Sequence, residues 1–168
     1  MKINHKLKIR AALAADFGHI QAIYADEVIR GIASFEEIPP SIRQLTHRWE
    51  EIQKHDLPFL VGVLDQQVVG FAYAAPYRFR PSWQDTVESV VYIDPAARQQ
   101  GLGTVLMESL IKQCRDRKQM IAVVSDSTNR ASIALHQSLG FQPAGRLERV
   151  GQRNGQWIDT LLFQRTLP

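Results

Sequence analysis

The spacing of hydrophobic residues divides the first part of the chain into a strand and two helices. Residues 7–11 alternate hydrophobic and polar side chains, which is typical of a half-buried strand. After Asp16, residues 17–28 repeat hydrophobic side chains at helical spacing, which predicts an amphipathic helix of about four turns. The pattern breaks at residues 30–35, and a second helix with one hydrophobic face is predicted to begin at Ser41.

The middle of the chain has the pattern of a β-hairpin followed by a strand. The hydrophobic runs 59–64 and 68–74 flank the polar residues 65–67, which predicts an antiparallel hairpin with a three-residue turn. Prolines bracket the segment 76–82, so we expect a loop there. The next strand is predicted at 86–93.

The last third begins with a helix after two glycines and ends with a hairpin. Helical spacing returns at Leu102, and a buried strand is predicted at 120–124. Asn129 is expected to open a further helix that ends at Gly140. Asn154-Gly155, the strongest short hairpin signal, lies between two more strands.

Composition limits the classes of protein that fit this pattern. The 168 residues are 45% hydrophobic, with no internal repeat or linker, so we expect a single mixed α/β domain over residues 1–168. No run is long enough for a membrane span, and no signal peptide is evident. A net charge of +3 is too small and dispersed to predict nucleic-acid binding. The one cysteine, Cys114, excludes a disulfide framework and a cysteine-rich metal site, and favours a cytoplasmic location.

Gly101 and Gly103 precede a predicted helix and suggest an anion site. Bare backbone N–H groups at a helix N-terminus bind phosphate, although the same pattern fits a tight turn into a packed helix. No lysine follows Gly103, which argues against a nucleotide-hydrolysing P-loop, and the third glycine of a dinucleotide fingerprint is replaced by Leu106.

Two further motifs make the pattern specific. Arg98 begins an Arg-x-x-Gly-x-Gly motif, and residues 129–141 contain Asn-Arg-Ala-Ser followed by Leu-Gly-Phe. These two motifs resemble the GNAT superfamily of N-acetyltransferases. The resemblance is narrowed by the strand 86–93, the loop 77–80, Leu135-His136 and the segment Gly155-Gln156-Trp157-Ile158-Asp159. Over nearly its full length, the chain resembles the phosphinothricin and methionine sulfoximine/sulfone acetyltransferase family.

The resemblance implies a fold, a cosubstrate and a set of residue roles. It implies a twisted, mostly antiparallel mixed sheet flanked by helices on both faces, acetyl-CoA as cosubstrate, and a homodimer. It implies that backbone groups of one strand hold the pantetheine arm and polarise the thioester carbonyl, that a loop wraps the pyrophosphate, and that Asn129 holds the pantetheine arm near the thiol. The residues concerned are Val91, Tyr92, Ile93, Arg98, Gln99, Gln100, Gly101, Leu102, Gly103, Thr104 and Asn129.

Glu88 is the candidate general base. It is a carboxylate within an otherwise hydrophobic strand, where burial would raise its pKa toward the working range; an outward-facing charge on a sheet edge is the alternative. Regular alternation places it on the same face as Val90 and Tyr92. His136 stands where many superfamily members have a tyrosine that protonates the thiolate. It is a second catalytic candidate, or else a packed histidine.

The candidate substrate residues come from two loops and one strand. Arg78 and Arg80 have guanidinium groups suited to an anionic substrate, but they also fit a solvated basic loop or a contact with CoA phosphates. Phe35 is either a substrate contact or a hydrophobic plug. The full candidate set is Phe35, Tyr77, Arg78, Phe79, Arg80, Glu88, Ser89 and Val90.

The expected reaction is direct acetyl transfer to the α-amine of a small amino acid analogue such as phosphinothricin, methionine sulfoximine or methionine sulfone. Two alternatives remain open. The first is a GNAT enzyme that acetylates a protein N-terminus, a polyamine or an antibiotic. The second is a non-catalytic acyl-CoA-binding regulatory domain, which would not need Glu88 as a buried base.

Overall fold

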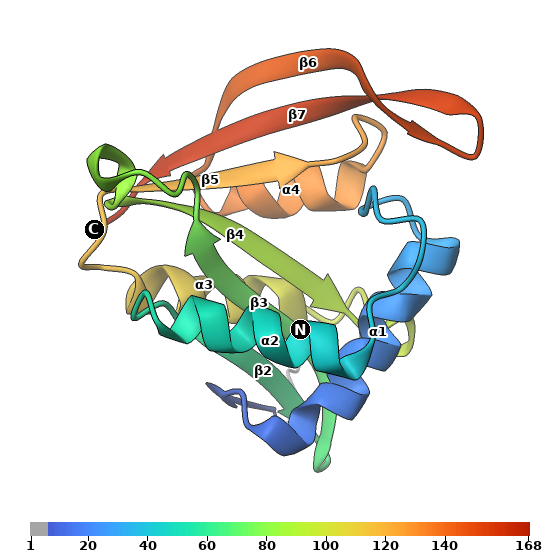
Figure 1. Ribbon diagram of the computed structural model, residues 1–168, viewed down its shortest axis with the longest axis vertical. Helices are drawn as coiled ribbons and strands as arrows, with labels where there is room; N and C mark the ends of the chain where they lie inside the picture. Colours follow the sequence, from blue (N-terminus) through green and yellow to red (C-terminus); the bar gives the residue numbers. More distant parts are fainter. Residues whose placement is uncertain (1–6) are drawn as a thin grey trace.

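The computed structural model describes residues 7–168, which form one seven-stranded sheet in the order β1-β2-β3-β4-β5-β7-β6 (Figure 1). The β4 and β5 strands pair in parallel and all other neighbours are antiparallel. The strands are β1 (Lys8–Ala11), β2 (Phe59–Leu64), β3 (Gln67–Pro76), β4 (Thr86–Ile93), β5 (Gln119–Val124), β6 (Gln142–Arg153) and β7 (Gln156–Thr166). The predicted mostly antiparallel mixed sheet is confirmed.

Four helices cover the two faces of the sheet. They are α1 (Phe17–Arg30), α2 (Ile42–Gln53), α3 (Leu102–Gln113) and α4 (Arg130–Ser138). Phe71 of β3 packs its ring near those of Phe59 and Tyr92 on the α1 and α2 side. Its neighbour Gly70 lies against Leu106 of α3 on the other face. Short 3-10 turns at Ala14–Asp16, Pro81–Trp83 and Pro95–Ala97 complete the elements.

The helix boundaries follow from local capping. The Ser41 side chain accepts a hydrogen bond from the Gln44 backbone N at 3.2 Å, so α2 begins where the sequence predicts. The Asn129 side chain accepts from the Ser132 backbone N at 3.1 Å and opens α4. Gly140 ends that helix with a φ of 79°.

Both tight hairpin turns have two residues. Asn154 and Gly155 have φ of 49° and 76° and join β6 to β7, as predicted. Asp65 and Gln66 have φ of 48° and 69°, so the turn between β2 and β3 is one residue shorter than the predicted three-residue turn. Gln67 instead begins β3 and pairs with Leu64. Neither position of this turn has the glycine or asparagine that most often marks this conformation.

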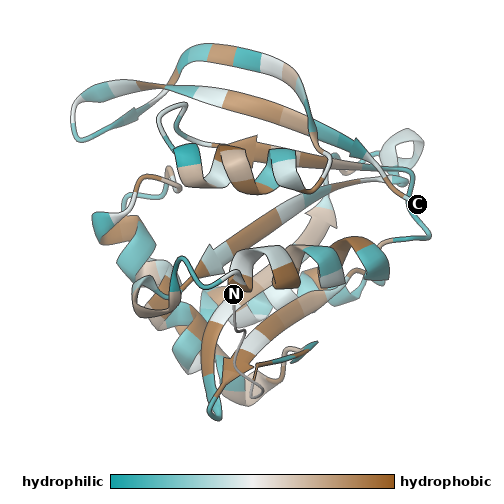
Figure 2. Cartoon of the chain, turned by 180° about the vertical axis from the view of Figure 1, so that it is seen from behind, coloured by the Kyte–Doolittle hydropathy of each residue, from teal (hydrophilic) through white to brown (hydrophobic). Residues whose placement is uncertain are grey.

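Hydrophobic residues concentrate on the central strands and on the helix sides that face them, whereas the free end of the β6–β7 hairpin is hydrophilic (Figure 2). That hairpin reaches beyond the rest of the sheet toward the C-terminal end of α1 (Figure 1). Arg153 at its tip donates hydrogen bonds to the carbonyl oxygens of Val28 at 2.9 Å and Ser34 at 2.5 Å. No helix within residues 7–168 has the length and hydrophobicity to cross a membrane.

Candidate active site

A gap between β4 and β5 forms the centre of the candidate site. The two strands pair in parallel from Thr86↔Gln119 to Ser89↔Ala122, and no pairing with β5 continues along the rest of β4. Backbone groups of residues 90–93 on that side therefore have no strand partner in β5. A ligand with an extended amide-containing arm can add to such an edge by hydrogen bonding.

The gap holds a cavity of about 120 Å³ that contains both catalytic candidates. Glu88, Ser89 and Val90 line it from β4, and Asn129 and His136 line it from the opposite side. The structure thus brings together residues that are far apart in the sequence. Their catalytic roles stay predictions.

Glu88 projects from the face of β4 that α1 and α2 cover. The β3–β4 register is regular, with Ala75↔Glu88, Tyr73↔Val90 and Phe71↔Tyr92, so no bulge disturbs the predicted alternation. Burial raises the pKa of the Glu88 carboxyl above its usual value. A base with a raised pKa binds a proton more strongly, which suits it to take one from an ammonium group.

The His136 side chain is buried and hydrogen-bonded to the backbone of its own helix. Its Nδ1 lies 2.8 Å from the carbonyl oxygen of Ser132, which can only accept, so Nδ1 carries a proton. Burial lowers the pKa of His136, which favours the neutral ring with no proton on Nε2. The ring also packs edge-on against Phe141 at 5.1 Å. The packed position was one of the two predicted alternatives, and as an acid the imidazole must first take up a proton at Nε2.

A second cavity of about 650 Å³ adjoins the first and leads to the N-terminus of α3. Both cavities are lined by Ala33, Val91, Tyr92, Asn129 and Ser132. The larger one is also lined by Ile93, Arg98, Gln99, Gly101, Leu102, Gly103 and Thr104.

The loop before α3 presents unpaired backbone donors to this cavity. Among residues 7–168, none accepts a hydrogen bond from the backbone N–H groups of residues 99–104. Gly101 has a φ of 79° and Gln99 a φ of 60°, a turn that exposes these groups before the helix begins. Unpaired N–H groups at the positive end of a helix dipole fit a diphosphate. Gly103 also packs closely, since a Cβ there would lie 3.4 Å from Leu135.

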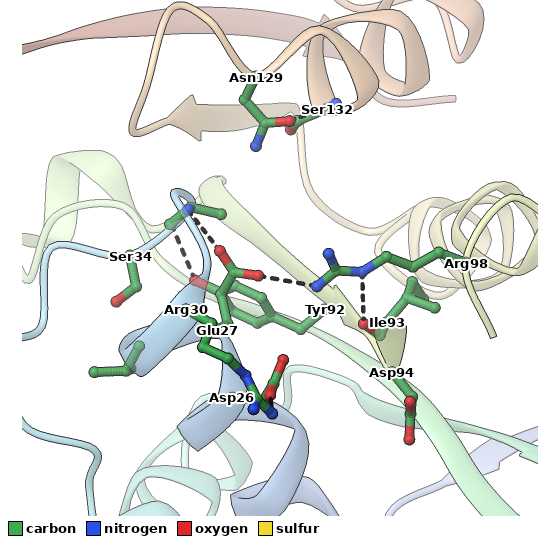
Figure 3. Close-up of polar contacts among 12 residues, drawn as sticks. Asp26, Glu27, Arg30, Ser34, Tyr92, Ile93, Asp94, Arg98, Asn129 and Ser132 are labelled. Atoms are coloured by element: carbon green, nitrogen blue, oxygen red, sulfur yellow. Dashed lines mark hydrogen bonds and ion pairs between the residues drawn. The ribbon is translucent and has the colours of Figure 1, made fainter. Parts of the chain in front are cut away.

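The side-chain amide of Asn129 presents its two ends in different directions. Its Oδ1 caps α4, and its Nδ2 points toward β4 across the gap (Figure 3). The side chain is therefore fixed by the helix and free to donate to a ligand in the cavity.

The candidate substrate residues of the two loops do not line either of these cavities. Arg78 is exposed and stacks over the rings of Tyr77 at 5.4 Å and Trp83 at 5.9 Å. Arg80 and Phe79 are also exposed. Phe35 is 38% exposed and packs against Gly151 of the β6–β7 hairpin. Their roles in substrate binding stay predictions.

Sequence inspection missed two charged residues near the site, Glu27 and Arg153. Glu27 is buried on α1, and its carboxylate pairs with Arg98. It stands four residues after Ile23 and three after Tyr24 on the hydrophobic stripe of that helix, a signal that was available. Arg153 had no such signal, because its partners are more than 100 residues away along the chain.

Other observations limit the chemistry. Cys114 is a buried core residue, and burial raises the pKa of its thiol to about 12, so it is poorly suited to act as a nucleophile. Within the described chain, no group of three or more His, Cys, Asp or Glu side chains is arranged to hold a metal ion.

Comparison with known proteins decides the family. The acetyltransferase (GNAT) family model matches residues 20–141. The chain belongs to the GNAT family. It is 44% identical over 161 residues to a phosphinothricin N-acetyltransferase of Alcaligenes faecalis, covering 95% of this chain and 82% of that protein. It is 34% identical to an L-methionine sulfoximine/L-methionine sulfone acetyltransferase of Pseudomonas paraeruginosa, covering 95% and 94%.

Solved structures support the same family. A GNAT phosphinothricin acetyltransferase from Sinorhizobium meliloti, crystallised with acetyl-CoA, superimposes with a TM-score of 0.93 at 36% identity, covering 96% of this chain and 89% of that one. The predicted GNAT fold and family are confirmed.

Proposed function

We propose that this GNAT protein transfers the acetyl group of acetyl-CoA directly to the α-amine of a small amino acid analogue with an oxidised side chain. Methionine sulfone, methionine sulfoximine and phosphinothricin are the proposed substrates. The observation that carries the proposal is the cavity between β4 and β5, which contains Glu88 and opens toward the unpaired N–H groups before α3. The names of the relatives support the substrate class.

The residues provide for each part of an acyl transfer. Glu88, directly or through a water, accepts a proton from the ammonium group, and the resulting amine attacks the thioester carbonyl carbon. Backbone N–H groups in residues 91–93 stabilise the oxyanion of the tetrahedral intermediate. The C–S bond then breaks, the nitrogen of the intermediate gives up its second proton, and the CoA thiolate takes up one proton, so that the products are the amide and the free thiol. His136 can pass this proton on through Nε2, which carries none in the neutral ring.

The anionic part of the substrate is assigned to the loop between β3 and β4. Arg78 and Arg80 carry two guanidinium groups on the loop that precedes β4, the strand of Glu88. A guanidinium group forms paired hydrogen bonds with carboxylate, phosphinate or sulfonyl oxygens. We assign Tyr77 and Phe79 to the same side of the substrate site as these arginines, and Phe35 to the side next to the β6–β7 hairpin.

We also propose a cytoplasmic homodimer in which the β6–β7 hairpin takes part in the interface. Leu147, Val150 and Trp157 of this hairpin are 45%, 54% and 62% exposed. Exposed hydrophobic side chains that gather on one element are typical of protein–protein contacts. Light scattering at several concentrations tests the dimer.

The substrate proposal is tested by following thiol release from acetyl-CoA with a panel of amines. The panel contains methionine sulfone, methionine sulfoximine, phosphinothricin, methionine, spermidine and a Ser-Ala peptide, and a reaction without amine is the blank. We expect rapid release with the first three and slow release with methionine. Turnover of spermidine or the peptide alone would overturn the substrate class, and no turnover of any amine would favour the acyl-CoA-binding alternative.

A further inference from the structure

The carboxylate of Glu27 is a buried group that the proposed reaction does not use. Glu27 is 5% exposed, and each of its oxygens is paired with a different part of the site. Oε2 accepts from Arg98 Nη2 at 3.0 Å, and Oε1 accepts from the backbone N of Ala33 at 2.7 Å (Figure 3). One side chain of α1 thus joins the loop before α3 to the segment after α1.

On the first side, Arg98 is the residue from which the loop 99–104 starts. Its Nε donates to the carbonyl oxygen of Ile93 at 3.2 Å, so the guanidinium bridges the end of β4 and Glu27 (Figure 3). The arginine side chain is 48% exposed and lines the cavity of about 650 Å³. An anion bound by the loop therefore lies close to the cation that holds Glu27.

On the second side, the segment 31–35 is held at several points. The carbonyl oxygen of Ala33 accepts from the hydroxyl of Tyr92 at 3.4 Å, while its N–H donates to Glu27. The carbonyl oxygen of Ser34 accepts from Arg153. Gly31 is needed for space, because a Cβ there would overlap the Glu27 carboxylate. Phe35, a candidate substrate residue, follows directly.

We propose that Glu27 is a positioning residue that couples the diphosphate half of the site to the segment 31–35, so that binding of CoA orders that segment. A buried carboxylate needs both its cation and its hydrogen-bond donor, and this requirement fixes Arg98 and the Ala33 N–H in one geometry. A coupling of this kind is reciprocal, so an ordered segment 31–35 also favours CoA binding. The inference rests on the proposed function only in that a CoA compound is the ligand.

Amide hydrogen exchange of the 31–36 peptide, with and without saturating CoA, tests the coupling. In the unaltered protein we expect CoA to slow exchange at Ala33 by roughly fivefold or more, the lower end of typical coupling between sites. In Glu27→Gln, the side-chain amide oxygen can still accept a hydrogen bond from the backbone N of Ala33. The amide NH₂ group and the Arg98 guanidinium are both donors, so the link between residue 27 and Arg98 is lost. We expect the CoA effect to fall below about twofold in this variant.

Asp26→Asn is the matched control. Asp26 is the adjacent carboxylate on α1; it pairs with the exposed Arg30 rather than with Arg98 (Figure 3) and is not among the residues that line the cavity. This variant should keep the full CoA effect. The CoA-dependent ratio of exchange rates is a readout that general destabilisation does not mimic, because destabilisation speeds exchange with and without CoA.

The outcomes separate the two proposals. Unchanged protection in Glu27→Gln, loss of protection in Asp26→Asn, or no protection in the unaltered protein would each overturn the coupling, whatever the enzymatic result. If CoA protects Ala33 in a Glu27-dependent manner while no amine in the panel is acetylated, the coupling stands and the proposed substrate class fails.

Discussion

Phe35 lies so close to Gly151 that a Cβ on residue 151 would overlap the phenyl ring. The two residues come from different parts of the chain, the segment after α1 and the β6–β7 hairpin. Gly151 does not have a positive φ, so its backbone conformation does not require glycine. The lack of a side chain instead leaves room for the phenyl ring of Phe35. The hairpin therefore fixes the position of a candidate substrate residue.

This contact predicts a selective effect of Gly151→Ala. The methyl group displaces Phe35, so we expect KM for methionine sulfone to rise by roughly tenfold, the effect of losing about 1.4 kcal/mol of binding. KM for acetyl-CoA should change little. Gly145→Ala in the same strand is the control, since a Cβ there would meet Leu162 at an ordinary 3.9 Å. Equal KM changes in both variants would show that Phe35 does not contact substrate.

The arginine loop predicts a change in selectivity rather than in chemistry. If Arg80 binds the oxidised group, Arg80→Gln should lower the ratio of kcat/KM for methionine sulfone over methionine by roughly tenfold, because a charge-assisted hydrogen bond is worth about 1.5–3 kcal/mol. Arg78→Gln tests the second guanidinium in the same way, with the further loss of its stacking on Tyr77 and Trp83. A ratio that stays the same in both variants would favour a solvated basic loop.

Cys114 should not react with thiol reagents in the folded protein. Burial raises its pKa to about 12, so at neutral pH almost none of it is the reactive thiolate. We expect a disulfide reagent such as DTNB to modify Cys114 only when denaturant unfolds the chain. The measurement is the rate of reaction with and without denaturant. Rapid reaction of the native protein would contradict a core position and would require a correction to the thiol-release assay.

Much of the fold was predictable because local signals agreed with the tertiary structure. The strand at Thr86–Ile93 has the predicted bounds, and Asn129 and Gly140 cap α4 as expected. The turn at Asp65 and Gln66 was predicted one residue too long, because Asp-Gln lacks the glycine that usually marks the second position of a two-residue hairpin turn. The spacing of hydrophobic residues indicates which side chains are buried, but it does not indicate the backbone conformation of a turn that contains no glycine.

The candidate site was predictable only in part. Glu88 stands out in the sequence as a carboxylate in a hydrophobic strand, and the glycine loop has a motif. The Glu27–Arg98 pair spans 71 residues, and the Arg153–Val28 contact spans 125. Such contacts depend on how elements pack in three dimensions, which no local pattern encodes.

The pH dependence of kcat/KM tests the central claim, that Glu88 is the base for acetyl transfer. Because burial raises the pKa of Glu88, the base is protonated and inactive at low pH. The rate should therefore rise with pH through a midpoint above the usual value for a glutamate. Glu88→Gln should abolish this rise of the rate with pH and lower kcat by roughly 10²–10⁴-fold, while the variant still binds acetyl-CoA.

The most direct measurement is thus the pH–rate profile of the unaltered protein and of Glu88→Gln with methionine sulfone, with a direct measurement of acetyl-CoA binding to both. The account predicts that kcat/KM rises with pH, with a midpoint above the usual glutamate pKa, only in the unaltered protein, and that both proteins bind acetyl-CoA with similar affinity. The same rise with pH in Glu88→Gln, or a kcat of this variant close to that of the unaltered protein, would contradict the assignment of Glu88 as the base.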